Sequence, residues 1–387
     1  MSDRPRLLYL ITEDWYFWSH RLDLARHAAQ AGFDVLIATR VTEHRDRIER
    51  EGFKLLPIRL DRRSRNPVAE LAAILELVRL YRRERPTIVH HVALKPIVYG
   101  SFAAWWSGVP NVINAFAGLG YVFTDQKRRK GVLGICLQYV YRILLSVNKS
   151  VVIFQNREDR DLLIEDRVVT LEHTRIIPGS GVDTKSFDVG PSPSGSPVVM
   201  LAARMLWDKG IGDFVEAVRS LKRQEVFARF VLVGRCDEHN PAAIEQAQLE
   251  AWVAEGLIEW WQHREDMPYV FSSATIVVLA SYREGLPKAL LEAAACGKPL
   301  IATDVPGCRE IVSHGINGFL VPPRNPDALA AAIDSLLRDS ALRGKMGQAG
   351  REAVLRSFSV EKVTGQLLAL YRELLARSEG LKATGLA

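Results

Sequence analysis

Residues Thr275–Glu292 have the sequence TIVVLASYREGLPKALLE, which contains a complete strand, loop and helix. The apolar, β-branched run Thr275–Ala280 is typical of a strand that is buried on both faces of a sheet. Pro287 suits the first turn of a helix, because backbone amides in that turn have no acceptor within the helix and the missing amide proton of proline costs nothing there. The stretch therefore predicts a parallel α/β sheet, with Glu284 and Gly285 in the loop at the carboxyl end of a strand.

The same alternation of short apolar runs and amphipathic segments extends to both sides of this stretch. Asn66 followed by Pro67 is a helix-start pattern. Strands are predicted at 6–12, 34–39, 87–91, 111–115, 150–154, 198–203, 228–234, 275–280 and 299–303, and helices at 19–31, 67–83, 212–223, 241–255, 287–296, 326–337 and 361–376. This order predicts an α/β protein with mostly parallel sheets that helices cover on both faces.

Chain length and one polar segment indicate two domains. A chain of 387 residues is too long for one ordinary hydrophobic core. Residues 190–197 (GPSPSGSP) interrupt the alternation and have the composition of a linker. We expect two doubly wound, Rossmann-like domains at 1–190 and 191–358, which face one another across a cleft. Ligands in such sheets bind beyond the carboxyl ends of the strands.

Charge is distributed unevenly along the chain. The net charge is +6, and residues 1–180 carry 28 Lys and Arg against 20 Asp and Glu, whereas the remainder carries 23 against 25. A basic surface attracts nucleic acid, anionic membranes or phosphorylated substrates, and charge alone does not choose among them. We expect no membrane span and no signal peptide, because no apolar run reaches 18 residues and the N-terminus lacks an apolar core.

Glu284 and Glu292 flank the start of the predicted helix. The backbone N–H groups around Leu286 to Lys288 lie at the positive end of that helix, which favours a phosphate. Glu292 lies roughly 8 Å further along the helix axis. Carboxylates accept strong hydrogen bonds from hydroxyls, so the pattern suits a nucleotide sugar with one carboxylate near the sugar and the other near the ribose. A capped surface helix with incidental glutamates fits the pattern equally well.

Arg204 and Lys209 directly follow another predicted strand, in the segment 204–210 (RMLWDKG). Two cations at this spacing can converge on one diphosphate and neutralise a leaving nucleoside diphosphate as its charge develops. Taken alone, the motif is explained more simply as two solvated basic residues in a loop.

Together, Arg204, Lys209, Glu284 and Glu292 resemble the donor site of the retaining GT-B glycosyltransferases of family four. The segments 297–307 (GKPLIATDVPG) and 318–322 (GFLVP) continue the resemblance, which covers nearly the whole chain. It implies the GT-B architecture, in which a C-terminal helix, here 359–387, crosses back to the first domain.

The resemblance also implies a role for each donor-site residue. Arg204 and Lys209 would hold the diphosphate, Glu292 the ribose and Glu284 the donor sugar, with Gly285 and Leu286 beside them. The implied reaction is metal-independent, and the leaving phosphate itself assists attack on the same face of the sugar. We therefore expect no metal and no cofactor.

The N-terminal half resembles a subgroup that extends undecaprenyl-diphosphate-linked sugars in surface polysaccharide or glycan assembly. The resemblance is carried by 17–21 (FWSHR), 95–100 (KPIVYG) and 109–124 (VPNVINAFAGLGYVFT). The acceptor-side candidates in these segments are His20, Lys95, Gly118 and Gly120. The two glycines would allow close backbone approach to a ligand. Lys95 would either meet an acceptor phosphate or be a solvated lysine at a helix start.

The chain departs from the family pattern at one histidine. Many members carry a histidine in the loop after the strand predicted here at 111–115, but residues 116–120 (FAGLG) contain none. His20, His90 and His91 are the nearby candidates for a polar contact in the site. Because a lone histidine is more often a satisfied structural residue, we assign none of them a catalytic role.

A basic collar precedes a strongly apolar segment in the first half. Lys127, Arg128, Arg129 and Lys130 are followed by 131–147 (GVLGICLQYVYRILLSV), which is too short to span a bilayer comfortably. An interfacial helix held by anionic lipid fits both the charge and the apolar face, and a buried helix of the first domain is the alternative. We expect a cytoplasmic protein that is peripheral on the inner face of the cytoplasmic membrane, beside a polyprenyl-diphosphate-linked acceptor.

Several functions remain open at this point. A UDP-sugar carrying a hexose or N-acetylhexosamine is the favoured donor, and GDP-mannose is the alternative. A nucleotide-sugar epimerase of the same architecture is a further alternative. A nucleic-acid-binding protein is the least favoured, because such proteins interleave cations with aromatic residues, and the arginine-rich region 45–65 has only Phe53.

Overall fold

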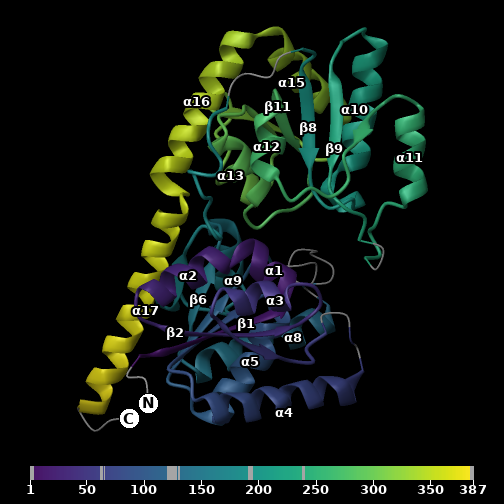
Figure 1. Ribbon diagram of the computed structural model, residues 1–387. Helices are drawn as coiled ribbons and strands as arrows, with labels where there is room; N and C mark the ends of the chain where they lie inside the picture. Colours follow the sequence, from purple (N-terminus) through teal and green to yellow (C-terminus); the bar gives the residue numbers. More distant parts are fainter. Residues whose placement is uncertain are drawn as a thin grey trace. The chain divides into compact units, whose positions relative to one another are not determined.

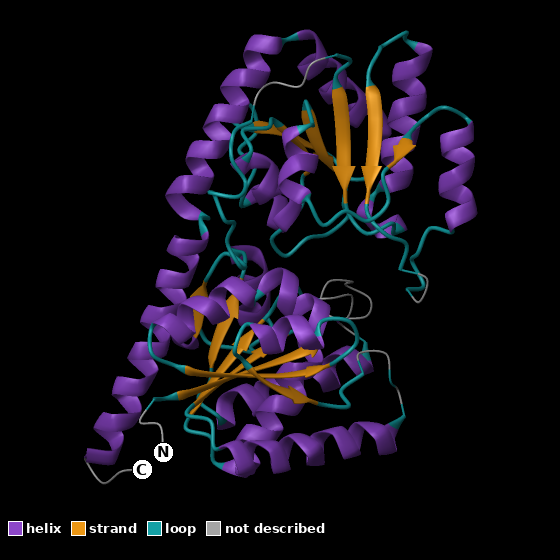
Figure 2. Cartoon of the chain, in the orientation of Figure 1, coloured by secondary structure: helices purple, strands orange, loops and turns teal. Residues whose placement is uncertain are grey.

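The computed structural model describes residues 4–61, 64, 66–119, 129, 131–190, 195–237 and 240–383. The chain forms two compact units, unit 1 with Met1–Ser180 and Val363–Ala387, and unit 2 with Gly181–Lys362. Each unit is built around a parallel sheet with helices against both faces (Figure 1, Figure 2). The predicted α/β class is confirmed.

In the described part of unit 1, seven strands form a sheet in the order β3-β2-β1-β4-β5-β6-β7, and all its pairings are parallel. The strands are β1 (Arg6–Glu13), β2 (Asp34–Arg40), β3 (Lys54–Pro57), β4 (Ile88–Val92), β5 (Asn111–Ala115), β6 (Val151–Phe154) and β7 (Thr174–Ile176). The helices are α1 (Asp14–His20), α2 (Leu22–Gln30), α3 (Arg45–Arg50), α4 (Pro67–Glu84), α5 (Leu94–Ser107), α8 (Val132–Val147), α9 (Arg157–Glu165) and the 3₁₀ turn η1 (Leu171–His173).

Successive side chains of β1 enter two different cores. Leu7 and Tyr9 pack with α1 and α2 on one face of the sheet. Leu8 and Leu10 pack with α4 and α5 on the other face. Because helices cover both faces, the strand needs apolar residues at every position instead of an alternating pattern. The helix predicted at 67–83 is confirmed as α4, and the Asn66 side chain accepts a hydrogen bond from the Val68 amide at 3.0 Å.

The single helix predicted at 19–31 is two helices in the structure. α1 follows β1 directly, and α2 begins at Leu22. Arg21 lies between them with φ −127°, outside the helical region. Its buried side chain donates a hydrogen bond to the Gly179 carbonyl at 3.3 Å. A contact with a residue far along the chain therefore accompanies the break, and no local pattern indicates it.

Asp14, the first residue of α1, fixes the loop after β2. Its carboxylate accepts hydrogen bonds from the backbone amides of Thr42, Glu43 and His44 at 2.8, 2.9 and 2.8 Å, and from the Thr42 hydroxyl at 2.5 Å. Burial alone would raise the pKa of Asp14, but the hydrogen bonds from Thr42, His44 and Glu43 hold this pKa below its ordinary value.

We expect Asp14 to make the protein less stable in acid. A carboxyl group with a depressed folded-state pKa contributes stability above its unfolded pKa of about 3.9, and the contribution is lost as the pH falls through the folded-state pKa. Thermal denaturation measured from about pH 6 down to about pH 3 should show a steeper loss for the wild type than for Asp14→Asn, which cannot titrate. Parallel curves for the two proteins would remove Asp14 from the acid response.

In the described part of unit 2, six strands form a sheet in the order β10-β9-β8-β11-β12-β13, again with parallel pairings. The strands are β8 (Val198–Ala202), β9 (Arg229–Val233), β10 (Glu259–Trp260), β11 (Ile276–Leu279), β12 (Leu300–Thr303) and β13 (Gly318–Val321). The helices are η2 (Trp207–Lys209), α10 (Ile211–Arg223), α11 (Gln246–Ala254), α12 (Met267–Ser272), α13 (Lys288–Ala295), α14 (Pro306–Arg309), α15 (Pro326–Arg338), α16 (Ser340–Ser357) and α17 (Val360–Ala383), which continues into unit 1.

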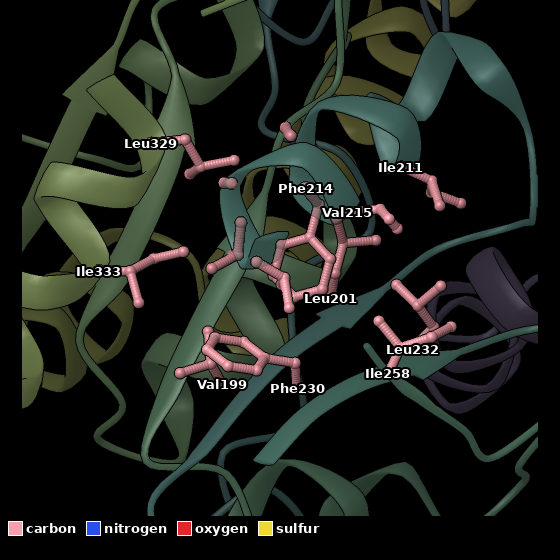
Figure 3. Packing of buried hydrophobic residues seen from close by; sticks show 14 of the residues in the cluster. Val199, Leu201, Ile211, Phe214, Val215, Phe230, Leu232, Ile258, Leu329 and Ile333 are labelled. Atoms are coloured by element: carbon pink, nitrogen blue, oxygen red, sulfur yellow. The ribbon is translucent and has the colours of Figure 1, made fainter. Parts of the chain in front are cut away.

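Figure 3 shows the core on one face of this sheet. Leu201 of β8 and Phe230 of β9 lie against Phe214 and Val215 of α10, and Ile333 of α15 belongs to the same cluster. These residues are all at most 2% exposed. The strands are thus anchored to the helices behind them, which leaves the loops at their carboxyl ends to carry functional residues.

The helix predicted at 241–255 is shorter in the structure, because α11 begins only at Gln246. The residues before it bond to the loop after β8 instead of forming a helical turn. The Trp207 amide donates to the Ala242 carbonyl at 2.8 Å, and the Ile244 amide donates to the Met205 carbonyl at 3.0 Å. Tertiary hydrogen bonds therefore replace helical ones at this point.

Along the chain, the boundary between the two units falls between Ser180 and Gly181, which precede the polar segment 190–197. The Val182 amide donates to the Phe358 carbonyl at 3.0 Å, and the Val360 amide donates to the Val182 carbonyl at 2.9 Å, so Val182 belongs with unit 2. Further along α17, its side chains enter a core of unit 1 through Val363, Leu367, Leu370, Tyr371 and Leu374. Of the helices that the structure describes, none combines the length and the apolar character that crossing a bilayer requires.

Candidate active site

The loops that follow β8 and β11 are neighbours because these two strands pair in the sheet of unit 2, with Leu201 opposite Val278. The chain continues from β8 to β9 on one side, whereas β11 leads to β12 on the other side. The strand order therefore reverses between β8 and β11. In open parallel sheets, ligands bind at the carboxyl edge beside such a reversal.

Lys209 and Glu284 are in direct contact across this reversal. The Nζ atom of Lys209 donates a hydrogen bond to Oε1 of Glu284 at 2.5 Å, and the two side chains are 21% and 13% exposed. Gly210 follows Lys209 with φ 66°, and a Cβ atom there would lie 2.0 Å from the Ala280 carbonyl oxygen. Because glycine lacks that atom, the loop after β8 can approach the end of β11 closely enough for the contact.

The backbone of Glu284 and Gly285 rests on the start of α14. The Gly307 amide donates to the Glu284 carbonyl at 3.3 Å, and a Cβ atom at Gly307 would lie 2.5 Å from the Gly285 carbonyl oxygen. In the sequence, Gly307 stands out only as the last residue of the segment 297–307, which resembles the family. The structure adds a physical reason for glycine at this position, because any larger residue would displace the loop that carries Glu284.

Arg204 pairs with a carboxylate that sequence analysis did not single out. Its guanidinium donates to Oδ2 of Asp237 at 3.0 Å, and the Asp237 side chain is only 13% exposed. Asp237 follows β9, the other neighbour of β8, so an acidic residue after the strand predicted at 228–234 was the available signal. Gly234, with φ 147°, lies against the Ala203 carbonyl oxygen, where a Cβ atom would be 1.8 Å away.

Glu292 lies inside α13, where its residue is 7% exposed. Its carboxylate pairs with the Lys288 ammonium at 3.1 Å, one turn earlier on the same helix. Leu286 belongs to the apolar cluster beneath the helix start. Pro287 is the N-cap residue, and its side chain has no oxygen to cap the first-turn amides. No side-chain cap therefore occupies the start of α13, and its anion-binding character stays a prediction.

Cys308 lies near the Lys209–Glu284 pair and is fully buried. Burial raises the pKa of its thiol, and the Glu284 carboxylate raises it further, whereas the Lys209 ammonium lowers it. Burial is the largest of these effects, so the thiol remains protonated at neutral pH.

The acceptor-side candidates lie in unit 1. His20 ends α1, stacks on Tyr16 at a ring distance of 4.3 Å, and has Nδ1 at 2.7 Å from the Ser19 hydroxyl. Gly118 follows β5 with φ 128°, a conformation that favours glycine. Gly120 lies outside the described residues. The roles predicted for His20 and Gly118 stay predictions.

Lys95 has three acceptors within unit 1, and its role as a ligand of an acceptor phosphate stays a prediction. Its ammonium donates to the Asp61 carbonyl at 2.7 Å, the Ser64 carbonyl at 2.9 Å and the Glu70 carboxylate at 2.8 Å. An ammonium has three donors, and these acceptors occupy all of them. Glu70 also accepts a hydrogen bond from the Tyr99 hydroxyl. An acceptor phosphate would have to displace one of these bonds.

His90 and His91 are buried in unit 1. Nδ1 of His90 lies 2.7 Å from the Tyr371 hydroxyl. His91 lies between the Asn114 side chain at 2.8 Å and the Tyr81 hydroxyl at 3.0 Å. Burial lowers the pKa of His91 to about 4, so this ring is neutral at physiological pH. These contacts support the interpretation of His91 as a structural residue whose ring nitrogens both have partners.

One residue of the basic collar turns toward the protein. The Arg129 guanidinium lies 3.7 Å from the Asp166 carboxylate, and both side chains are 17% exposed. The contact of Arg129 with a membrane stays a prediction. Lys127, Arg128 and Lys130 lie outside the described residues. Among the residues that the structure does describe, no group of three or more His, Cys, Asp or Glu side chains could hold a metal ion.

Two protein-family models match the chain. The model described as glycosyl transferases group 1 matches residues 182–353, which include Arg204, Lys209, Glu284 and Glu292. The model described as glycosyl transferase 4-like matches residues 6–156. The two matches together cover most of both units.

Two relatives align with most of the chain. The chain is 28% identical over 321 residues to the N,N'-diacetylbacillosaminyl-diphospho-undecaprenol alpha-1,3-N-acetylgalactosaminyltransferase of Campylobacter jejuni. This alignment covers 80% of this chain and 83% of the relative. The chain is also 24% identical over 323 residues to the UDP-Gal:alpha-D-GlcNAc-diphosphoundecaprenol alpha-1,3-galactosyltransferase of Escherichia coli. This second alignment covers 80% of this chain and 81% of the relative.

Solved structures show the same fold. A glycosyltransferase of Rickettsia africae matches with a TM-score of 0.79 at 21% identity, over 96% of this chain and 99% of that chain. HepE of Anabaena, solved in complex with UDP and glucose, matches with a TM-score of 0.76 at 18% identity, over 96% of this chain and 100% of that chain. The fold is thus the GT-B fold of glycosyltransferases.

Proposed function

Because this chain belongs to the group 1 glycosyltransferases, we propose that it transfers a hexose or N-acetylhexosamine from a UDP-sugar to a lipid-diphosphate-linked sugar. The observation that carries the proposal is the Lys209–Glu284 contact of 2.5 Å beside the strand-order reversal of unit 2. The choice of substrates follows the two relatives, whose names specify N-acetylgalactosamine or galactose transfer to undecaprenyl-diphosphate-linked sugars.

The two cations of the site are held in place before any donor binds. Lys209 is oriented by Glu284, and Arg204 by Asp237. A diphosphate at the carboxyl edge of β8 would share these cations with their carboxylate partners. Cations that are already oriented need little reorganisation when negative charge develops on the leaving UDP, and this preorganisation is a large source of rate enhancement.

The two glutamates would bind the hydroxyl groups of the donor. We assign Glu284 to the sugar and Glu292 to the ribose diol, because each carboxylate accepts charge-assisted hydrogen bonds. Lys288 holds the Glu292 carboxylate on α13 with an ion pair of 3.1 Å. A carboxylate that is 7% exposed and already oriented loses little conformational entropy when it binds a diol.

The family resemblance supports retention of configuration without a metal ion. In such a reaction the bond from the anomeric carbon to the UDP oxygen breaks, and the acceptor oxygen bonds to the same face. The acceptor proton passes to the leaving phosphate. Arg204 and Lys209 would stabilise the charge of the leaving group, the task that a divalent cation performs in metal-dependent transferases.

The lipid-linked acceptor implies work at the inner face of the cytoplasmic membrane. α8 exposes several large apolar side chains, among them Val132, Ile135 and Tyr139. The sequence places the cations Lys127 and Lys130 just before this helix. An apolar helix face with adjacent cations favours a peripheral position on an anionic bilayer.

The test is a transfer assay with the purified full chain and an undecaprenyl-diphosphate-linked acetamido sugar in vesicles. UDP-N-acetylgalactosamine, UDP-galactose and GDP-mannose are offered separately, with and without EDTA. We expect one UDP-sugar to give an α-linked product at a rate that EDTA does not change. Transfer from GDP-mannose alone would favour the alternative donor. A β-linked product would overturn retention, and loss of activity in EDTA would overturn metal independence.

A further inference from the structure

A groove lies at the amino ends of β6 and β7, at the opposite edge of the unit 1 sheet from the carboxyl ends of the strands. Its volume is about 560 Å³. The C-terminal half of α8, the residues after α9 and the segment leading to β7 form its walls. Its apolar lining includes Leu145, Val152 and Val168, and its basic lining includes Arg142, Lys149 and Arg167. We refer to it as the α8–α9 groove.

The three cations of the groove are exposed and carry an uncompensated charge. Among the residues that the structure describes, none of their side chains has a hydrogen bond or ion-pair partner. The groove contains one carboxylate, Glu172, and this already lies beside the Thr170 hydroxyl and 3.5 Å from His173. The groove is therefore a concave surface with net positive charge, which attracts an anion.

Two of these cations occupy positions where helices usually end in glycine. Lys149 follows α8 with φ 45°, and Arg167 follows α9 with φ 55°. Left-handed backbone is unfavourable for residues with a Cβ atom. The negative ends of the two helices attract cations, which accounts for one cation at each end. Arg142, which lies more than a turn before the end of α8, is outside the reach of that effect.

The helix that forms one wall of the groove also carries an apolar stripe on its exposed side. The exposed large apolar residues of α8 follow helical spacing and are Val132, Ile135, Tyr139, Val140, Ile143 and Val147. Water solvates such a stripe poorly, whereas the boundary between lipid headgroups and acyl chains accommodates it. Apolar surface and unpaired cations therefore occur together on α8.

We propose that the α8–α9 groove binds the phosphate of an anionic phospholipid headgroup while the apolar stripe of α8 lies among the acyl chains. This inference rests on the peripheral membrane location in the proposed function. Arg142, Lys149 and Arg167 contact the phosphate, and the apolar lining contacts the glycerol and the first methylene groups. α8 has 16 residues and is therefore about 24 Å long, and the groove cations Arg142 and Lys149 lie in its C-terminal half and directly after it.

The experiment compares vesicle binding by three single variants, each of which removes one cation and places glycine at a left-handed position. Lys149→Gly and Arg167→Gly change the groove. Arg85→Gly is the matched control, because Arg85 is exposed, ends α4 with φ 48° and lies outside the groove. Glycine suits all three backbones, so each variant should keep the thermal stability of the wild type or exceed it.

Binding is measured by co-sedimentation with phosphatidylglycerol vesicles and with phosphatidylcholine vesicles. We expect each groove variant to bind the anionic vesicles about fivefold more weakly than Arg85→Gly does, because a cation near an anionic surface contributes about that factor. Equal binding by all three variants would overturn the proposal, since net charge alone would then explain the attraction. Inorganic phosphate that binds the groove without any vesicle binding would also overturn it.

A transfer assay with a short-chain, water-soluble acceptor separates this inference from the proposed function. The groove variants should keep the wild-type rate on that acceptor while their vesicle binding falls. A wild-type protein that binds vesicles through the groove but transfers no sugar would contradict the proposed function and leave the groove as a lipid site. Full transfer activity with equal vesicle binding by all three variants would support the proposed function and overturn the groove as a lipid site.

Discussion

Replacing Lys209 with alanine should lower kcat by about 10²- to 10³-fold, the range found when one preorganised donor to a developing negative charge is removed. Lys209 is held at 2.5 Å from Glu284, beside the strand-order reversal where a diphosphate would bind. Its ammonium would act mainly on the departing UDP, so kcat should fall more than the affinity for the donor. Initial rates at saturating donor, together with UDP binding by calorimetry, measure the two effects separately.

Two further variants decide whether the effect of Lys209 is chemical or structural. Lys345→Ala removes an exposed lysine from α16 and should leave kcat unchanged. Lys209→Ala also leaves the 13% exposed Glu284 without its cation, which by itself destabilises the protein. The double variant Lys209→Ala/Glu284→Gln removes that unpaired charge and should recover thermal stability but not kcat. Because Glu284 is itself assigned to the donor sugar, recovery of kcat would contradict the roles proposed for both Lys209 and Glu284.

Replacing Glu292 with glutamine should weaken UDP binding by about tenfold or more, because hydrogen bonds to a charged acceptor are worth about 1.5–3 kcal/mol. Glutamine keeps the size of the side chain but removes the negative charge that the ribose hydroxyls would meet. Glu292 is 7% exposed and fixed by Lys288 at 3.1 Å, so solvent screens the interaction only weakly. Calorimetric titration with UDP measures the loss.

Deoxyribose analogues of UDP connect the effect to the ribose. The wild type should bind 2′-deoxy-UDP or 3′-deoxy-UDP about tenfold more weakly than UDP, whereas Glu292→Gln should show almost no further loss with the same analogue. The two losses would then not add, because both changes remove the same hydrogen bond. Losses that add fully would place Glu292 away from the ribose, and normal UDP binding by Glu292→Gln would remove it from the donor site.

Local physics was enough to predict most elements of this fold. Asn66 and Pro67 determine the start of α4 through a cap and a fixed φ angle, both of which act within one helical turn. The strand at 111–115 was predicted with its observed bounds because Val112 and Ile113 at its centre are β-branched and apolar, although Asn111 and Asn114 are polar. Elements whose ends depend on distant contacts were predicted less well, as the junction at Arg21 shows.

The candidate site divides in the same way. The sequence alone places Arg204, Lys209 and Glu284 in loops that follow strands, because strand periodicity and helix-start residues are local signals. Only the tertiary structure decides that β8 and β11 are neighbours, which brings Lys209 to Glu284 across 75 residues of chain. The partner of each charged group is chosen when distant loops dock.

Lys95 and Arg129 show what that choice changes. Both are cations in segments with a phosphate-binding or membrane-binding pattern, yet Lys95 is occupied by Asp61, Ser64 and Glu70, and Arg129 faces Asp166. The sequence determines which side chains are charged and the element on which each lies. The tertiary structure decides which charges remain available to a ligand, because a buried or half-buried cation is stable only where folding provides an acceptor for it.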